Sequence, residues 1–222
     1  MAGSIYLGKA DRSAEEPFEV KRMSQMMGND NISPRVPFPR SYWVVPGKLL
    51  AGYYPGGLDT ERTEENAKGL LWAGIRYVIN LMEENERNRY GDPLPSYENV
   101  IMRYAKRAGF NLTCARRPTK DLVAPTPEYM RNILDEIDNT ILQGRPVYVH
   151  CWGGKGRTGT VVGCYLARHG YAQGEDILDL IEKLRRNDPE VDHPSPETRQ
   201  QRDMVTTWQE GAKQRWKYPG EP

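Results

Sequence analysis

The 222-residue chain has no long apolar run, no surplus of charge of one sign and no paired cysteines. No apolar stretch approaches the roughly 20 residues that a bilayer-crossing helix needs, so no membrane span is expected. The N-terminus lacks an apolar core, which argues against a secretory signal. The formal net charge is only +1. So small a charge gives no global field for nucleic acid or an anionic membrane, and no nucleic-acid partner is expected.

Cysteine and histidine are both scarce, with three of each in the chain. Cys114, Cys151 and Cys164 show no paired spacing. Their odd number, together with the need for a free thiol argued below, indicates a reducing compartment and a cytoplasmic location. We interpret Cys114 and Cys164 as buried structural residues, with a protective disulfide to Cys151 under oxidation as the alternative. The histidines are scattered, and neither a metal site nor a cofactor is expected.

Strand-like and helix-like apolar patterns alternate along most of the chain. Strands are predicted at residues 42–45, 49–53, 75–81, 110–115 and 146–149, the first two as a hairpin. Helices are predicted at residues 59–74, 97–107, 126–141 and 177–184, and directly after residue 158. Because strands alternate with helices, the predicted fold class is α/β, a single domain with a central, mostly parallel sheet flanked by helices.

Residues 1–40 show little periodicity, and several prolines interrupt them. We interpret them as an N-terminal extension that precedes a folded domain at residues 41–218. Arg22, Arg35 and Arg40 of this extension are interpreted as scattered surface arginines, with a contribution to binding an anionic partner as the alternative.

The most informative segment is residues 150–159, which read HCWGGKGRTG. It follows an apolar run that is predicted to be a buried strand and precedes an apolar helical pattern. A thiol, a glycine-rich loop and an arginine therefore lie between a strand end and a helix start. Such a loop points backbone N–H groups inward, and the helix N-terminus adds positive potential. The segment is suited to hold a tetrahedral oxyanion beside a thiolate, at the strand end where open α/β sheets bind ligands.

Each residue type in this loop has a chemical reason. A cysteine has an unperturbed pKa of about 8.5, and inward amides, the helix end and the Thr158 hydroxyl would all favour the Cys151 thiolate. Arg157 can grip two phosphate oxygens at once. His150 is expected to orient the loop from behind. The intervening residues are predicted to bind the substrate phosphate: Trp152, Gly153, Gly154, Lys155 and Gly156.

The pattern His-Cys-x5-Arg-Thr at residues 150–158 resembles the signature of the cysteine-dependent protein tyrosine phosphatase superfamily, most closely its dual-specificity and tensin-type branches. The resemblance covers roughly residues 42–210 and is strongest at 146–160. It implies a phosphatase-like fold, with residues 41–218 as the catalytic domain. It also implies hydrolysis of phosphate monoesters through a cysteinyl-phosphate, without a metal.

The resemblance further implies an acid on an upstream loop, in an x-Pro-x-x-Asp pattern. Asp121 matches this pattern in residues 117–121, after a predicted strand and before a predicted helix start. Family members often carry apolar residues before the proline, whereas this chain has arginines at 116 and 117. Asp92, Asp135 and Asp138 are the weaker rivals for this role.

Near the C-terminus, residues 196–201 resemble the Gln-Thr-x-x-Gln stretch by which tyrosine phosphatases position the hydrolytic water. Gln201 matches the second glutamine and is a possible water-positioning residue. Glu197 stands where the first glutamine is expected. The alternative is a packed helix, because apolar residues recur at helical spacing at 205, 208, 212 and 216.

Substrate identity is the point that the residues leave open. A dual-specificity or tyrosine protein phosphatase, acting on a phosphorylated protein, is predicted first. A phosphoinositide or inositol phosphate phosphatase is second, because Lys155, Lys120, Arg116 and Arg117 would favour a multiply charged substrate. An RNA 5′-triphosphatase is third. From other classes, a catalytically weak phosphate-binding module and a sulfurtransferase remain alternatives. The oligomeric state is not predicted.

Overall fold

The computed structural model describes residues 35–57, 59–88 and 90–210. Its centre is a five-stranded sheet in the order β1-β2-β5-β3-β4. The strands are β1 (Ser41–Val45), β2 (Leu49–Gly52), β3 (Tyr77–Asn80), β4 (Thr113–Arg116) and β5 (Val147–His150). β1 and β2 form an antiparallel hairpin, and the other neighbouring pairs are parallel. The predicted α/β class with a mostly parallel sheet is therefore confirmed.

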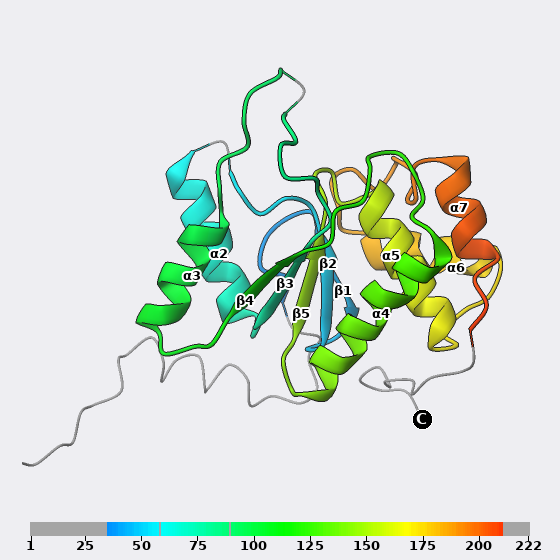
Figure 1. Cartoon of the computed structure of the whole chain (residues 1–222), viewed down its shortest axis with the longest axis horizontal. Helices are drawn as coiled ribbons and strands as arrows, with labels where there is room; N and C mark the ends of the chain where they lie inside the picture. Colours follow the sequence, from blue (N-terminus) through cyan, green and yellow to red (C-terminus); the bar gives the residue numbers. More distant parts are fainter. Residues whose placement is uncertain (1–34, 58, 89, 211–222) are drawn as a thin grey trace, which may run out of the picture. The chain divides into compact units, whose positions relative to one another are not determined.

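Helices cover both faces of the sheet (Figure 1). On one side lie α2 (Thr60–Trp72) and α3 (Glu98–Arg107). On the other side lie α4 (Pro127–Leu142), α5 (Gly156–Arg168), α6 (Asp176–Arg185) and α7 (Arg199–Thr206). None of the helices in the described part of the chain is long and apolar enough to cross a membrane.

Local capping explains where several helices begin. The Asp59 carboxylate accepts the backbone N–H of Arg62 (2.7 Å) at the start of α2. Thr126 caps α4, and a proline follows it in the first turn, where its missing N–H costs nothing. Both helix starts agree with those predicted from the sequence. Each such cap stabilises a helix by about 1 kcal/mol.

The sheet brings the ends of distant segments to one edge. β5 is buried along its whole length between β2 and β3. In the register of the sheet, His150 lies beside Gly52 on one side and Asn80 on the other, and Asn80 lies beside Arg116. Because these strands are parallel, the loops after them meet at the same edge. The segment at 150–159 therefore lies where ligands bind in such folds.

The C-terminal helix is shorter than the apolar pattern predicted. α7 ends at Thr206, so Trp208 lies beyond it, and positions 212 and 216 of the pattern lie outside the described residues. Beyond the helix, the Glu210 carboxylate pairs with the buried Arg168 of α5 and accepts the indole N–H of Trp208 (3.2 Å). The predicted extension at residues 1–40 lies outside the described residues up to residue 34, and the predicted domain boundaries stay a prediction.

Candidate active site

The loop from Cys151 to Lys155 joins β5 to α5 and folds back on the sulfur of Cys151. The Cys151 side chain is buried, and the backbone N–H of Gly154 donates to its Sγ at 3.3 Å. Gly154 has φ = +71°, and a Cβ there would lie 2.6 Å from the carbonyl carbon of Gly52. Both the conformation and the close approach require glycine at this position.

Arg157 lies in the first turn of α5 with its side chain 1% exposed. Glu86 binds both of its terminal nitrogens, and Asp121 Oδ1 lies 3.2 Å from Nη2. Burial alone would lower the pKa of this guanidinium, but the Glu86 carboxylate outweighs it and the pKa is raised. The Nε–H of Arg157 is buried and has no acceptor among the described residues. It is therefore available to an oxyanion in the loop.

His150 is held between a tyrosine and the loop backbone. Its Nε2 lies 2.7 Å from the Tyr97 hydroxyl, and its Nδ1 lies 3.2 Å from the Cys151 carbonyl oxygen. The carbonyl can only accept, so the network assigns the imidazole proton to Nδ1 and the tyrosine O–H donates to Nε2. Burial lowers the pKa of His150 to about 3. A neutral imidazole in this position can orient the loop, and the predicted role stays a prediction.

Thr158 is buried behind the loop. Its hydroxyl donates to the Gly52 carbonyl oxygen at 3.4 Å, which ties the start of α5 to the end of β2.

Asp121 lies in a turn after β4, with its side chain 60% exposed. Its contact with Arg157 brings the predicted acid to the loop that carries Cys151. The rivals lie elsewhere: Asp135 and Asp138 on α4 bind Arg168 at 2.8 and 3.1 Å, and residue 92 contacts the Asn88 side chain.

Gln201 is fully buried at the start of α7. Its Oε1 accepts the backbone N–H of Thr198 (3.1 Å) in a capping box. A Cβ built on Gly156 would lie 3.2 Å from this same oxygen, so the amide packs against the loop. Its Nε2 is buried and has no partner among the described residues. The structure thus brings Gln201 against Gly156 at the start of α5, and its role with water stays a prediction.

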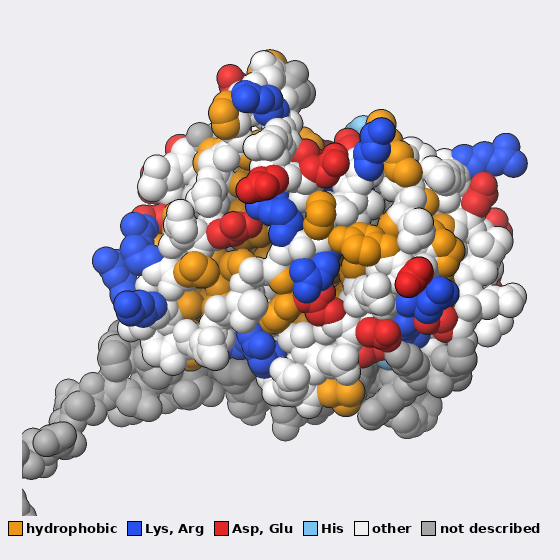
Figure 2. Space-filling model, in the orientation of Figure 1, with side chains coloured by type: hydrophobic (Ala, Val, Ile, Leu, Met, Phe, Trp, Pro, Cys, Tyr) orange, Lys and Arg blue, Asp and Glu red, His pale blue; other side chains and the backbone are white. Residues whose placement is uncertain are grey.

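Three of the four basic residues considered near the loop are already paired. Lys155 Nζ binds Glu190 at 2.7 Å, although the sequence allowed it to serve a multiply charged substrate. Arg116 pairs with the carboxylate of residue 98 at 3.1 Å, and Arg117 pairs with that of residue 136 at 2.6 Å. Lys120 is exposed. Figure 2 shows acidic and basic side chains intermixed over the visible face.

Four residues at the site were not predicted as functional: Glu86, Tyr97, Glu190 and Arg40. Glu86 belongs to a largely acidic segment, residues 83–86, that is separated from the end of β3 by two residues. Its place after a strand beside β5 was the signal that could have revealed it. Arg40 was interpreted as a surface residue, which is wrong: it donates to the Gly153 carbonyl at 2.8 Å and its side chain is only 25% exposed. Nothing in the sequence around Tyr97 or Glu190 distinguishes them from other loop residues.

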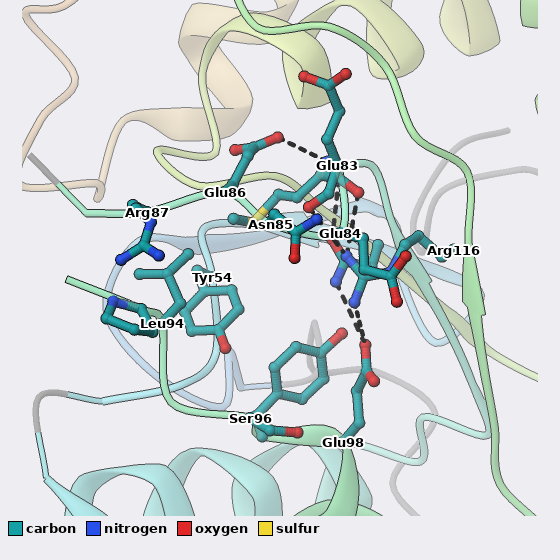
Figure 3. Close-up of a pocket in the computed structure, with 14 residues that line it drawn as sticks. Tyr54, Glu83, Glu84, Asn85, Glu86, Arg87, Leu94, Ser96, Glu98 and Arg116 are labelled. Carbon is teal, nitrogen blue, oxygen red and sulfur yellow. Dashed lines mark hydrogen bonds and ion pairs between the residues drawn. The ribbon is translucent and has the colours of Figure 1, made fainter. Parts of the chain in front are cut away.

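A pocket of about 220 Å³ lies beside Arg157, between the segment after β3 and the start of α3 (Figure 3). Its charged lining consists of Glu83, Glu84, Glu86, Glu98, Arg87 and Arg116. Arg116 and Glu98 point toward one another across it. Tyr54 also lines the pocket, and its ring centroid lies 5.7 Å from that of Trp152, which is 38% exposed. Neither Cys151 nor Asp121 lines this pocket, so it adjoins the site through Glu86 and Tyr54 and is not the mouth of the site.

The other two cysteines are isolated thiols. All three cysteines are free, Cys164 is fully buried, and Cys114 is partly buried on β4. Burial raises the pKa of the Cys114 thiol to about 12 and that of Cys164 well above its ordinary value. Protonated thiols are poor nucleophiles, as expected of structural cysteines.

Comparison with known proteins gives relatives along most of the chain. Residues 39–214 match the family described as the DSP-PTPase phosphatase domain of Swiss Army Knife proteins. Dual specificity protein phosphatase 9 of Homo sapiens is 24% identical over 186 residues, which cover 83% of this chain and 43% of that protein. Phosphatidylglycerophosphate phosphatase PTPMT2 of Arabidopsis thaliana is 38% identical over 80 residues, which cover 35% of this chain and 34% of that protein. The chain thus spans less than half the length of these curated relatives.

Solved structures show the same fold. PTPMT1 in complex with PI(5)P has a TM-score of 0.54 at 20% identity, over 76% of this chain and 94% of that chain. Tk-PTP in its active form has a TM-score of 0.52 at 22% identity, over 76% and 95%. At these identities the likeness concerns the fold.

Proposed function

Since the chain belongs to the DSP-PTPase phosphatase-domain family of Swiss Army Knife proteins, we propose that it hydrolyses phosphate monoesters through a cysteinyl-phosphate, with phosphorylated proteins as its substrates. One observation carries the proposal: the Gly154 N–H on the Cys151 sulfur and the unpaired Arg157 Nε belong to one short segment, the loop after β5 and the first turn of α5. A nucleophile and oxyanion donors are thereby held together.

In the proposed reaction the Cys151 thiolate attacks phosphorus in line with the leaving oxygen. Arg157 and the loop amides stabilise the equatorial oxygens as charge spreads over them. Protonated Asp121 gives its proton to the leaving alkoxide or phenoxide. The P–O bond to the leaving group breaks, and a P–S bond to Cys151 forms.

In the second step a water molecule attacks the cysteinyl-phosphate. The Asp121 carboxylate takes a proton from this water, Gln201 positions it, and Thr158 assists departure of the thiolate. Inorganic phosphate leaves, and the thiolate and the protonated acid are restored. His150, neutral because it is buried, orients the loop through its contact with the Cys151 carbonyl.

The charges and the aromatic residues around the loop support a protein substrate. Lys155 is neutralised by Glu190, so it does not offer its charge to further phosphates. The pocket beside Arg157 is lined by four glutamates and two arginines, a balance that disfavours a polyanion. Trp152, which is 38% exposed and packs on the buried Tyr54, offers an aromatic face on which a phosphotyrosine ring can stack.

A phosphoinositide or related phospholipid is the second candidate. The similarity to the phosphatidylglycerophosphate phosphatase PTPMT2, and the fold shared with PTPMT1 bound to PI(5)P, favour it. A cytoplasmic location is part of the first proposal, because the reaction needs Cys151 reduced.

Phosphate release separates these candidates. The assay compares wild type with Cys151→Ser and Asp121→Asn, in the absence of metal. The substrates are phosphotyrosine, phosphothreonine and phosphoserine peptides, and phosphoinositide vesicles. We expect wild type to prefer the peptides and Cys151→Ser to be inactive while still binding vanadate. Asp121→Asn should lose most rate on poor leaving groups. Faster release from the vesicles would favour the lipid candidate, and vanadate binding without any release would favour a binding module.

A further inference from the structure

Arg40, directly before β1, reaches the back of the catalytic loop. Its Nη2 donates to the Gly153 carbonyl oxygen at 2.8 Å. The peptide between residues 153 and 154 is planar and trans, so its carbonyl and its N–H point in opposite directions. That N–H belongs to Gly154 and donates to the Cys151 sulfur. The bond from Arg40 on the outer side therefore fixes the direction of the N–H on the inner side.

Three contacts hold the Arg40 side chain in place. Its Nη1 pairs with Glu190 at 2.9 Å, and the other oxygen of that carboxylate binds Lys155 of the same loop. The guanidinium carbon also lies 4.8 Å from the centre of the Tyr53 ring. Arg40 is thus linked to the loop twice, once directly and once through Glu190.

The backbone of Arg40 carries strain that its contacts must offset. Its φ is +65°, a left-handed conformation that is unfavourable for a non-glycine residue. Its carbonyl accepts the N–H of Tyr53 (3.2 Å), and a Cβ on Gly52 would lie 2.6 Å from that same carbonyl oxygen. Residue 52 also lies against Gly154, as described above. Three backbone segments are therefore packed so closely that the loop peptide and Arg40 cannot shift independently.

Glu190 is itself anchored. Its backbone carbonyl accepts from the buried Arg185 at 3.0 Å, and its N–H donates to the Asp188 carboxylate at 2.9 Å. This anchoring keeps the carboxylate facing Arg40 and Lys155.

We propose that Arg40 is a positioning residue for Cys151: it fixes the 153–154 peptide so that its N–H stabilises the thiolate, and Glu190 holds Arg40 in that position. The inference depends on the proposed function only for the identity of the nucleophile. The other groups that face the sulfur are Arg157, Tyr42 and Tyr148. Tyr148 also interacts with the charge of Arg40, and the salt control described below separates that contribution.

The test is alkylation of Cys151 by iodoacetamide as a function of pH, followed by peptide mass mapping. In Arg40→Met the thiolate loses an oriented donor, so alkylation should be about tenfold slower at about pH 6 and unchanged at about pH 9.5. Arg40→Lys keeps one charged donor, so its alkylation rate at about pH 6 should lie between those of wild type and Arg40→Met. Glu190→Gln should shift the curve in the same direction. Arg103→Met, which breaks an ion pair on α3 far from the loop, is the matched control and should follow wild type.

Several outcomes would overturn the inference. One is a curve for Arg40→Met that coincides with wild type. Another is a shift of the Arg40→Met alkylation curve that disappears in about 0.5 M salt. Such a result would show that the charge of Arg40 acts on the thiolate through space and does not orient the peptide. If Arg40→Met does not fold, as judged by circular dichroism, Glu190→Gln carries the same test. Alkylation of Cys151 needs no turnover, so this test and the phosphatase assay can fail separately. If wild type is an active phosphatase but Arg40→Met does not shift the alkylation curve, only this inference is rejected. If Arg40→Met shifts the curve but wild type releases no phosphate, only the phosphatase proposal is rejected.

Discussion

The buried neutral His150 should make the fold sensitive to mild acid. Its pKa falls from about 6.5 in the unfolded chain to about 3 in the folded chain because burial penalises the imidazolium. Between these two values the unfolded chain binds the extra proton, so stability falls as the pH is lowered. The loss begins below about pH 6.5 and ends near the folded pKa.

The size of the effect follows from linkage. From about pH 8 to about pH 5, a group with these two pKa values lowers the free energy of unfolding by about 2 kcal/mol. This figure depends little on the folded value, because pH 5 lies well above it. A loss of that size is a large fraction of the 5–15 kcal/mol that stabilises a typical domain.

Urea unfolding at the two pH values measures this loss in wild type, His150→Asn and His193→Asn. The loss should shrink by about 2 kcal/mol in His150→Asn, which has no group to protonate. It should persist in His193→Asn, since that side chain is exposed. If His150→Asn does not fold, nuclear magnetic resonance of the wild-type imidazole gives the answer directly. An imidazole that titrates near pH 6 in the folded protein would refute the reasoning.

Two further predictions concern the loop and its partners. Glu86→Ala leaves the buried Arg157 without its main partner, so the free energy of unfolding should fall by about 3 kcal/mol in urea titrations, while exposed Glu84→Ala should stay within about 0.5 kcal/mol of wild type. Gly154→Ala drives a Cβ into backbone atoms, and kcat/KM should fall by about a hundredfold. Gly144→Ala has nearly the same φ but open space, so it should cost about 1 kcal/mol of stability and leave kcat/KM intact; equal activities of the two variants would show that the close approach is irrelevant.

Local patterns were enough to predict most of the fold. Local sequence predicted three features correctly: the strand β5, the capped start of α4 and the β1–β2 hairpin. Each depends on apolar spacing or turn residues within a few positions. The end of α7 was not readable. The segment after it is held by Glu210, which pairs with Arg168 of α5, 42 positions earlier, and no local pattern indicates such a contact.

The candidate site divides in the same way. Cys151 and Arg157 belong to one contiguous motif, and the turn that holds Asp121 carries its own proline signal. Glu86 and Arg40 reach the loop from 71 and 113 positions away in the sequence. Only the sheet register brings them there, so the sequence gives at most the position of Glu86 after a strand as a signal and gives no sign of the Arg40 contact.

The most direct test of the central claim is to trap the covalent intermediate. The wild-type protein is mixed with an aryl phosphate, quenched in acid within milliseconds and digested, and the peptide that contains Cys151 is weighed. A phosphoryl group on Cys151, absent from the matching peptide of Cys151→Ser, is the predicted result. Steady release of phosphate by the wild type with no phosphoryl group on that peptide, and undiminished release by Cys151→Ser, would contradict the account.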